Sequence, residues 1–293
     1  RGIFNREGAQ EQCSWVGRDS KVRYGVNPCA EILLKPQEFC NLTEIIIRAN
    51  DKVSDIKRKV EIATILGTCQ SALTYFPFLR EKWKKNCEEE RLLGVSFTGI
   101  YDNTLTWGKD GLDKLATRLA RWRRYCEEVN RDWAEKIGIT PSLARTCVKP
   151  SGTVSCLCNT SSGIHPRFAE HYIRRVRIDK KDPIYNLLKD AGVPVEDCVL
   201  NPTHTCVFLF PLQAPKSSCI SDDVTALEHL ELWRVYKSYW CDHNPSVTIN
   251  YTDSDYISIG AWVWENFDDI QGLSFLPRVE HVYEQAPFEA IDE

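Results

Sequence analysis

The chain has 293 residues, of which 43% are hydrophobic and 27% charged, a composition typical of globular proteins and not of disordered, collagen-like or rod-shaped ones. It carries 37 Lys and Arg against 41 Asp and Glu, which argues against a protein that coats nucleic acid. No apolar run approaches the ~20 residues of a membrane-spanning helix, and no secretory signal opens the sequence. We therefore expect a cytoplasmic protein that binds neither a membrane nor a nucleic-acid polymer.

Two residue counts are unusual. The sequence contains no Met and opens on Arg1, which predicts a piece of a longer protein or a sequence from which residues are missing. It contains 13 Cys, most of them scattered singly through apolar runs, so we expect mainly buried, reduced thiols. The close pair Cys156 and Cys158 has no matching second pair with the spacing of zinc ligands, so we expect no metal site.

The first informative stretch is Asn27-Pro28-Cys29-Ala30-Glu31. In an extended segment its amide, thiol and carboxylate would share one face. Pro28 cannot donate a ladder hydrogen bond, which predicts a loop or sheet edge. Such a row offers a sulfur reactant, a base and a positioning amide, although a buried Cys beside a solvated Glu has the same spacing. Cys40 follows eleven residues later, and two neighbouring thiols permit two-electron chemistry through a disulfide.

Helices alternate with short apolar strands along the rest of the chain, which favours an α/β fold with parallel pairing. A helix follows Ser54, its expected N-cap, and places Leu66 on its apolar face. The clearest helix is predicted over 111–138, where apolar residues recur every three or four positions up to Gly138. Two more helices are expected from Asp222 and after the capping box at 252–255. The predicted strands are 92–100, 146–149, 172–178, 205–210, 246–250 and 273–276, and the apolar run within 205–210 suits a strand covered on both faces.

A glycine-containing loop at about 149–156 directly follows one of these strands. Gly152 would let backbone N–H groups approach an anion closely, and the neighbouring hydroxyls would add donors. The loop lacks the Gly-Lys-Ser/Thr of a Walker motif, and an ordinary Pro-Gly turn would look similar. The candidate phosphate-binding residues are Ser151, Gly152, Thr153, Val154 and Ser155.

Taken in order, these motifs resemble those of ribonucleotide reductase large subunits. The segment at about 22–36 resembles the family's finger loop, and Phe39-Cys40-Asn41-Leu42 resembles its next strand. The loop at 149–156 resembles the substrate-phosphate loop, and the stretches from Asn244 and Gly272 match the end of the fold in kind. The resemblance covers essentially all 293 residues. It implies a single domain over 1–293, forming the second half of a ten-stranded α/β barrel with the finger loop inside.

The resemblance also implies a role for each motif residue. Cys29 would form the thiyl radical that abstracts the ribose 3′-hydrogen, and Glu31 would be the base on the 3′-hydroxyl. Asn27 would bind a ribose hydroxyl, and Cys40 would be half of the dithiol that reduces the 2′ position. The loop 151–155 would hold the phosphates. The implied partners are a ribonucleotide, thioredoxin or a similar dithiol, and the missing N-terminal portion of the enzyme.

The resemblance is to the adenosylcobalamin-dependent class, especially its short, monomeric ribonucleoside-triphosphate reductase branch, so it implies adenosylcobalamin as cofactor. The gap from Cys29 to Cys40 is short, no adjacent Tyr pair is present as in the iron-dependent class, and Glu31 counts against the glycyl-radical class. Two alternatives stay open. One is a catalytically incomplete half-subunit that works only with a separate N-terminal chain. The other is a nucleotide-phosphate-binding module without radical chemistry.

Overall fold

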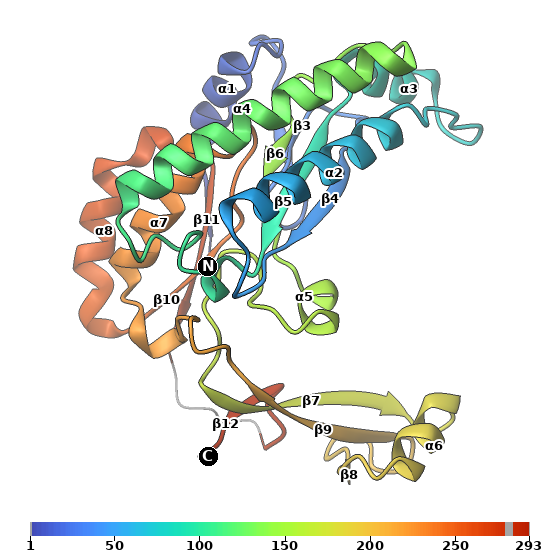
Figure 1. Ribbon diagram of the computed structural model, residues 1–293, viewed down its shortest axis with the longest axis vertical. Coiled ribbons are helices and arrows are strands. Elements are labelled where there is room, and N and C mark those ends of the chain that lie inside the picture. Colours follow the sequence, from blue (N-terminus) through green and yellow to red (C-terminus); the bar gives the residue numbers. More distant parts are fainter. Residues whose placement is uncertain (1, 279–283, 293) are drawn as a thin grey trace.

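The computed structural model describes residues 2–278 and 284–292 as a mixed α/β fold. Figure 1 shows helices packed outside two small sheets in one part of the molecule and an antiparallel arm that projects from it. The helices are α1 Arg6–Trp15, α2 Val53–Ser71, α3 Glu81–Glu90, α4 Leu112–Ile137, α5 Thr153–Leu157, α6 Pro183–Asp190, α7 Ala226–Tyr239 and α8 Tyr256–Glu265, with short 3-10 turns η1 Ile100–Asp102, η2 Ser221–Asp223, η3 Asp253–Asp255 and η4 Phe267–Asp269.

The strands form four separate sheets. Two of these contain parallel pairs, in the orders β4-β5-β6 and β1-β11-β10, and a parallel bridge between Val148 and Pro245 links them. The other two are the hairpin β2-β3 and the antiparallel arm β12-β7-β9-β8. The strand bounds are β1 Gly2–Phe4, β2 Gly25–Val26, β3 Leu33–Leu34, β4 Asn41–Ile46, β5 Leu93–Thr98, β6 Thr146–Cys147, β7 His171–Asp179, β8 Val195–Asp197, β9 Thr205–Gln213, β10 Thr248–Tyr251, β11 Gly272–Pro277 and β12 Phe288–Ala290.

Alternation along the parallel strands separates an apolar face from a polar one. Ile45, Val95 and Phe97 belong to a buried core that they share with α2, α4 and α7, the helices that cover this face (Figure 1). Neighbouring positions point the other way, and register places Glu44 opposite Ser96 and Ser96 opposite Cys147. The face turned away from the helices therefore carries polar side chains and thiols.

Several predicted elements are confirmed. The helix over 111–138 is α4, and Gly138 ends it with a positive φ of 73°. The capping box at 252–255 forms as predicted, with Thr252 and Asp255 bonded reciprocally ahead of α8. All 13 cysteines are free thiols, and eight of them are buried.

Other sequence expectations are wrong in detail. Lys52, not Ser54, occupies the N-cap of α2, and Leu66 is exposed because it lies on the outer side of that helix. The helix predicted from Asp222 begins at Ala226, because the capping box of Thr225 and Glu228 starts it there. Parallel pairing is also wrong for 172–178 and 205–210, which form the antiparallel pair β7–β9, with the end of β9 only partly covered.

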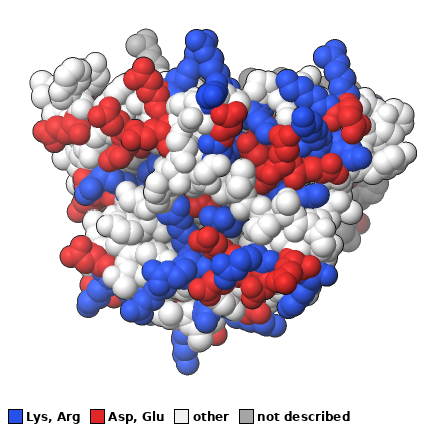
Figure 2. Space-filling model, turned by 90° about the horizontal axis from the view of Figure 1, so that it is seen from above, with Lys and Arg blue, Asp and Glu red and all other residues white. Residues whose placement is uncertain are grey.

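On the surface, basic and acidic side chains lie interspersed over the face seen in Figure 2, as expected from a net charge near zero. Among the described helices, none combines the length and apolar composition needed to cross a bilayer. The described residues also contain no group of three or more His, Cys, Asp or Glu placed to hold a metal ion.

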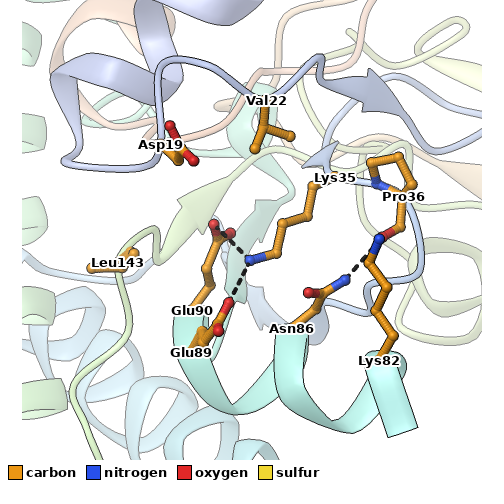
Figure 3. Close-up of a pocket in the computed structure, with 9 residues that line it drawn as sticks. All are labelled: Asp19, Val22, Lys35, Pro36, Lys82, Asn86, Glu89, Glu90 and Leu143. Carbon is orange, nitrogen blue, oxygen red and sulfur yellow. Dashed lines mark hydrogen bonds and ion pairs between the residues drawn. The ribbon is translucent and has the colours of Figure 1, made fainter. Parts of the chain in front are cut away.

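A buried charge network fixes the base of the hairpin β2-β3. The guanidinium of Arg18 lies 3.1 Å from the Glu38 carboxylate and 2.7 Å from that of Glu90. Lys35 reaches Glu89 and Glu90 at 3.2 Å each, beside a cavity of about 360 Å³ (Figure 3). Burial and a hydrogen bond with Glu90 raise the pKa of Glu38 to about 8, whereas Arg18 lowers the pKa of Glu90 against the effect of burial. The two carboxyl groups therefore share one proton at neutral pH.

This shared proton predicts a pH-dependent stability. Because the folded-state pKa of Glu38 lies above its ordinary value of 4.5, its contribution is present below pH 4.5 and lost as the pH rises through about 8. We expect Glu38→Gln, which stays neutral, to reduce the loss of unfolding free energy between about pH 6 and about pH 9 by roughly 1–3 kcal/mol. Urea unfolding at both pH values measures this difference.

The matched control is Glu135→Gln on the exposed side of α4, which should unfold like the wild type at both pH values. An identical pH dependence in wild type and Glu38→Gln would show that Glu38 is ionised in the folded protein.

Candidate active site

The tip of the hairpin β2-β3 is a tight turn that carries Cys29. The backbone N–H of Asn27 donates to Ile32 O at 3.2 Å, and Asn27 Oδ1 accepts the N–H of Ile32 at 3.0 Å. Ala30 N–H donates to Asn27 O at 2.9 Å, and Ala30 has a φ of 60°. The turn predicted from Pro28 is therefore confirmed, but the extended row of side chains is wrong, because Ala30 reverses the chain between Cys29 and Glu31.

Cys29 and Glu31 consequently differ in environment. Cys29 is exposed, whereas Glu31 is 3% exposed and its Oε2 has no hydrogen-bond partner among the described residues. Partial burial and the charge of Glu31 raise the pKa of Cys29, and the ammonium of Lys149 lowers it. The net shift is upward, so Cys29 keeps its S–H at neutral pH. A thiol of this kind suits transfer of a hydrogen atom better than attack as a thiolate.

Cys40 lies just ahead of β4, near Glu31. Burial raises its pKa well above the ordinary value of 9.0, and the charges of Glu38 and Glu31 act in the same direction. A further thiol, Cys147 on β6, is fully buried, and its pKa is also raised, first by burial and then by Cys40. Strand β5 lies between β4 and β6, and a Cβ at its Gly94 would lie 3.1 Å from Cys147 Sγ. The motifs did not predict Cys147 as a neighbour of Cys40, because the two thiols lie far apart in sequence.

The loop after β6 is held by its own hydroxyl groups. Ser151 Oγ accepts the N–H of Ser155 at 3.0 Å, and Ser155 Oγ donates to Ser151 O at 2.5 Å. These two hydroxyls are buried within the loop, whereas Thr153 carries an exposed one. Gly152 and Thr153 are exposed, and a Cβ at Gly152 would meet nothing within 4 Å. The open part of this loop is therefore its backbone at 152–154.

Lys149 connects this loop with the tip of the hairpin. Its N–H donates to Ser96 Oγ at 2.8 Å, and its Nζ lies 2.8 Å from Oε2 of Glu44, which is largely buried. The same ammonium acts electrostatically on Cys29. The structure thus brings the thiol at the hairpin tip and the first residue of the candidate phosphate loop to one polar face. The loop motif did not predict this role of Lys149, since its partner Glu44 is distant in sequence.

His165 links the segment that follows this loop to β10 through hydrogen bonds. Its Nδ1 lies 2.9 Å from Ser162 O, and its Nε2 accepts the N–H of Thr248 at 2.9 Å. Burial lowers its pKa, which keeps the ring neutral and lets one nitrogen donate while the other accepts. These contacts give His165 a structural role in holding the loop.

Comparison with known proteins places this geometry in context. No known family model matches the chain. It is 30% identical over 277 residues to a probable adenosylcobalamin-dependent ribonucleoside-triphosphate reductase of Dictyostelium discoideum, and 30% identical over 279 residues to such an enzyme of Euglena gracilis. The enzyme of Lactobacillus acidophilus is 28% identical over 303 residues. These alignments cover 92–94% of this chain but only 35–40% of the relatives.

Solved structures agree on the fold. A B-12-dependent (class II) ribonucleotide reductase superimposes on 92% of this chain and 41% of its own, with a TM-score of 0.79 and 24% identity. The class Id ribonucleotide reductase alpha subunit of Actinobacillus ureae gives 0.62 at 13% identity. The resemblance predicted from the motifs is thereby confirmed: nearly the whole of this chain is similar to a little over a third of an adenosylcobalamin-dependent ribonucleoside-triphosphate reductase.

Proposed function

We propose that this chain is the part of an adenosylcobalamin-dependent ribonucleotide reductase that reduces ribonucleotides to 2′-deoxyribonucleotides. The observation that carries the proposal is the pairing at the hairpin tip. A protonated, accessible thiol, Cys29, lies two residues before a buried carboxylate, Glu31, whose Oε2 has no partner among the described residues. Lys149 then joins this tip to a loop with open backbone N–H groups.

Each residue of the tip has a role in this reaction. Cys29, once oxidised to the thiyl radical, takes the 3′-hydrogen atom of the ribose and later returns one. Glu31 accepts the proton of the 3′-hydroxyl through its unpartnered oxygen. Asn27 Oδ1 is already bonded to Ile32, so Asn27 would bind a ribose hydroxyl with its Nδ2. Holding these groups on one short turn supplies the orientation that a reactive radical needs.

Cys40 supplies reducing equivalents. Two thiols become a disulfide, and the 2′-hydroxyl leaves as water, which balances the two electrons that the ribose gains. Burial raises the pKa of Cys40, so the thiol holds the proton that the departing hydroxyl would take up. The family resemblance implies that the second thiol of this dithiol lies in the remaining part of the enzyme. Thioredoxin or a similar dithiol would reduce the disulfide after each turnover.

The loop 149–156 would bind the substrate phosphates. The backbone at 152–154 is open, and α5 starts at Thr153, so the N–H groups at this end have no helical partner. The hydroxyls of Ser151 and Ser155 shape the loop from inside. Its backbone would therefore make the phosphate contacts, with Ser151 and Ser155 fixing its conformation.

Adenosylcobalamin fits the chemistry of this tip. The thiol of Cys29 is exposed and keeps its hydrogen, so it can be reached from outside the chain and can lose a hydrogen atom. When bound, this cofactor supplies the radical chemistry that turns a thiol into a thiyl radical. Cys29 is the residue that would face it, and burial together with the charge of Glu31 raises the pKa of this thiol and so favours its protonated form.

The proposed architecture extends the observed fold. The two sheets joined at Val148 and Pro245 would be half of a ten-stranded barrel, with 1–293 as one domain and the hairpin inside. The remaining strands would come from the N-terminal portion of the enzyme, in the cytoplasm. This partner also defines the main alternative, a half-subunit active only with a separate N-terminal chain.

Replacing the proposed radical residue tests the reaction directly. In the full-length protein, with adenosylcobalamin, a ribonucleoside triphosphate and a dithiol, Cys29→Ser should lower deoxynucleotide formation by about three orders of magnitude or more, because a hydroxyl does not replace the thiyl radical. Chromatography of the products measures the yield. Cys69→Ser, at another exposed thiol, should retain activity. Deoxynucleotide formation by Cys29→Ser at the wild-type rate would rule out the mechanism.

A second variant tests the phosphate loop. Gly152 has a φ of −88° and open space around its Cβ position, so Gly152→Val should fold normally. Its side chain would occupy the space proposed for phosphate, and we expect roughly 10- to 100-fold weaker binding of a ribonucleoside triphosphate. Equilibrium dialysis with labelled nucleotide measures this. Gly260→Val in α8, also next to open space, is the control, and equal affinity in both variants would place the phosphates elsewhere.

A further inference from the structure

The dipeptide His243-Asn244 lies between α7 and β10 and joins the hairpin to both parallel sheets. Asn244 is fully buried. Its Nδ2 donates to Ala30 O at 2.9 Å and approaches Gly272 O at 3.3 Å, and its backbone N–H donates to Glu31 O at 3.1 Å. One residue therefore binds two successive carbonyls at the hairpin tip and ties them to β11.

The contacts fall where the hairpin most needs support. Ala30 is a residue with a Cβ in the left-handed region, with a φ of 60°, and such a conformation persists only when its surroundings hold it. It separates Cys29 from Glu31, so its conformation sets the angle between thiol and carboxylate. Gly272 completes the support, since a Cβ there would lie 3.2 Å from Ala30 Cβ.

His243 secures the next part of the same hairpin. Its Nδ1 accepts the N–H of Leu33 at 3.4 Å, and its Nε2 donates to Leu93 O on β5 at 3.1 Å. Burial lowers the pKa of His243 to about 3, so the ring stays neutral with one donor and one acceptor. Asn244 thus links the tip of the hairpin to β11, and His243 links β3 to β5.

We infer that Asn244 is a positioning residue of the site, which together with His243 holds the Cys29–Glu31 turn in its reactive geometry. Asn244 does this through its amide donors and not through contact with a substrate. The consequence for turnover rests on the proposed function. The consequence for the environment of Cys29 does not, because it follows from the contacts alone.

Asn244→Ala in the full-length protein tests this role. It removes both amide donors, and we expect kcat to fall about 100-fold, since small displacements of reacting groups have effects of that size. Ribonucleotide affinity should stay within about two-fold, because the phosphate loop is untouched. Alkylation of Cys29 by iodoacetamide, followed by peptide mass spectrometry, should become several-fold faster, since moving the thiol away from Glu31 lowers its pKa.

Asn244→Asp is a second variant of the same size. It sets a carboxylate oxygen against the carbonyls of Ala30 and Gly272, so kcat should again fall with nucleotide affinity retained. The matched control is Asn266→Asp, where an amide that donates to Trp262 O at 2.8 Å lies at the end of α8, and here kcat should stay at the wild-type value.

Either of two results would overturn the inference. One is wild-type kcat and wild-type Cys29 alkylation in a folded Asn244→Ala protein. The other is loss of the folded state in both Asn244 variants, which would mean that this residue holds the sheets together and not the turn. The alkylation measurement needs no turnover, so it decides the role of Asn244 even if the wild-type protein proves to have no reductase activity.

Discussion

The site depends on holding a short turn whose backbone belongs to no larger sheet. A two-strand hairpin is marginally stable by itself, and its tip exposes carbonyls and N–H groups that need partners. Asn27 satisfies some of these groups within the turn, and Asn244 satisfies others from outside. The buried network of Arg18 with Glu38 and Glu90 anchors the other end. Polar contacts at both ends, together with the packing of Leu33 and Val26 in a small apolar cluster, thus determine where the thiol lies.

The same polar face controls the protonation of its thiols. Burial raises the pKa of Cys29, Cys40 and Cys147, and Glu31 adds to each of these shifts. Lys149 opposes the shift of Cys29 and Cys147, but it is itself paired with Glu44. Enzymes that use a nucleophilic cysteine place cations or helix N-termini beside it to stabilise the thiolate. Here the net effect of the surroundings is to raise the pKa of all three thiols and favour the S–H form, which agrees with the hydrogen-atom and proton transfer proposed at sulfur.

Local pattern was sufficient for elements whose determinants lie close together in sequence. The period of α4 with its final Gly138, the capping box of Thr252, and the turn at Pro28 all depend on neighbours within a few residues. The motifs that predicted the family are also short stretches, so each can be read from consecutive residues. What could not be predicted depends on distant partners: the bond of His243 to Leu93 spans 150 positions, and the antiparallel arm required knowing that β9 returns along β7. The left-handed Ala30 likewise follows from contacts that its local sequence does not contain.

In the proposed reaction, the unpartnered buried acceptors favour a particular orientation of the substrate. Among the described residues, Glu31 Oε2 and Glu44 Oε1 are two carboxylate oxygens that are buried without hydrogen-bond donors. Unpaired buried acceptors are costly, and they favour a ligand that brings hydroxyl groups over one that brings negative charge. The open backbone N–H groups at 152–154 have the opposite preference. A molecule with an anionic end and a neutral diol, as in a nucleotide, satisfies both when its phosphates lie at the loop and its sugar at Glu31. The alternative of a module that binds only phosphate leaves Glu31 Oε2 at the hairpin tip without a partner.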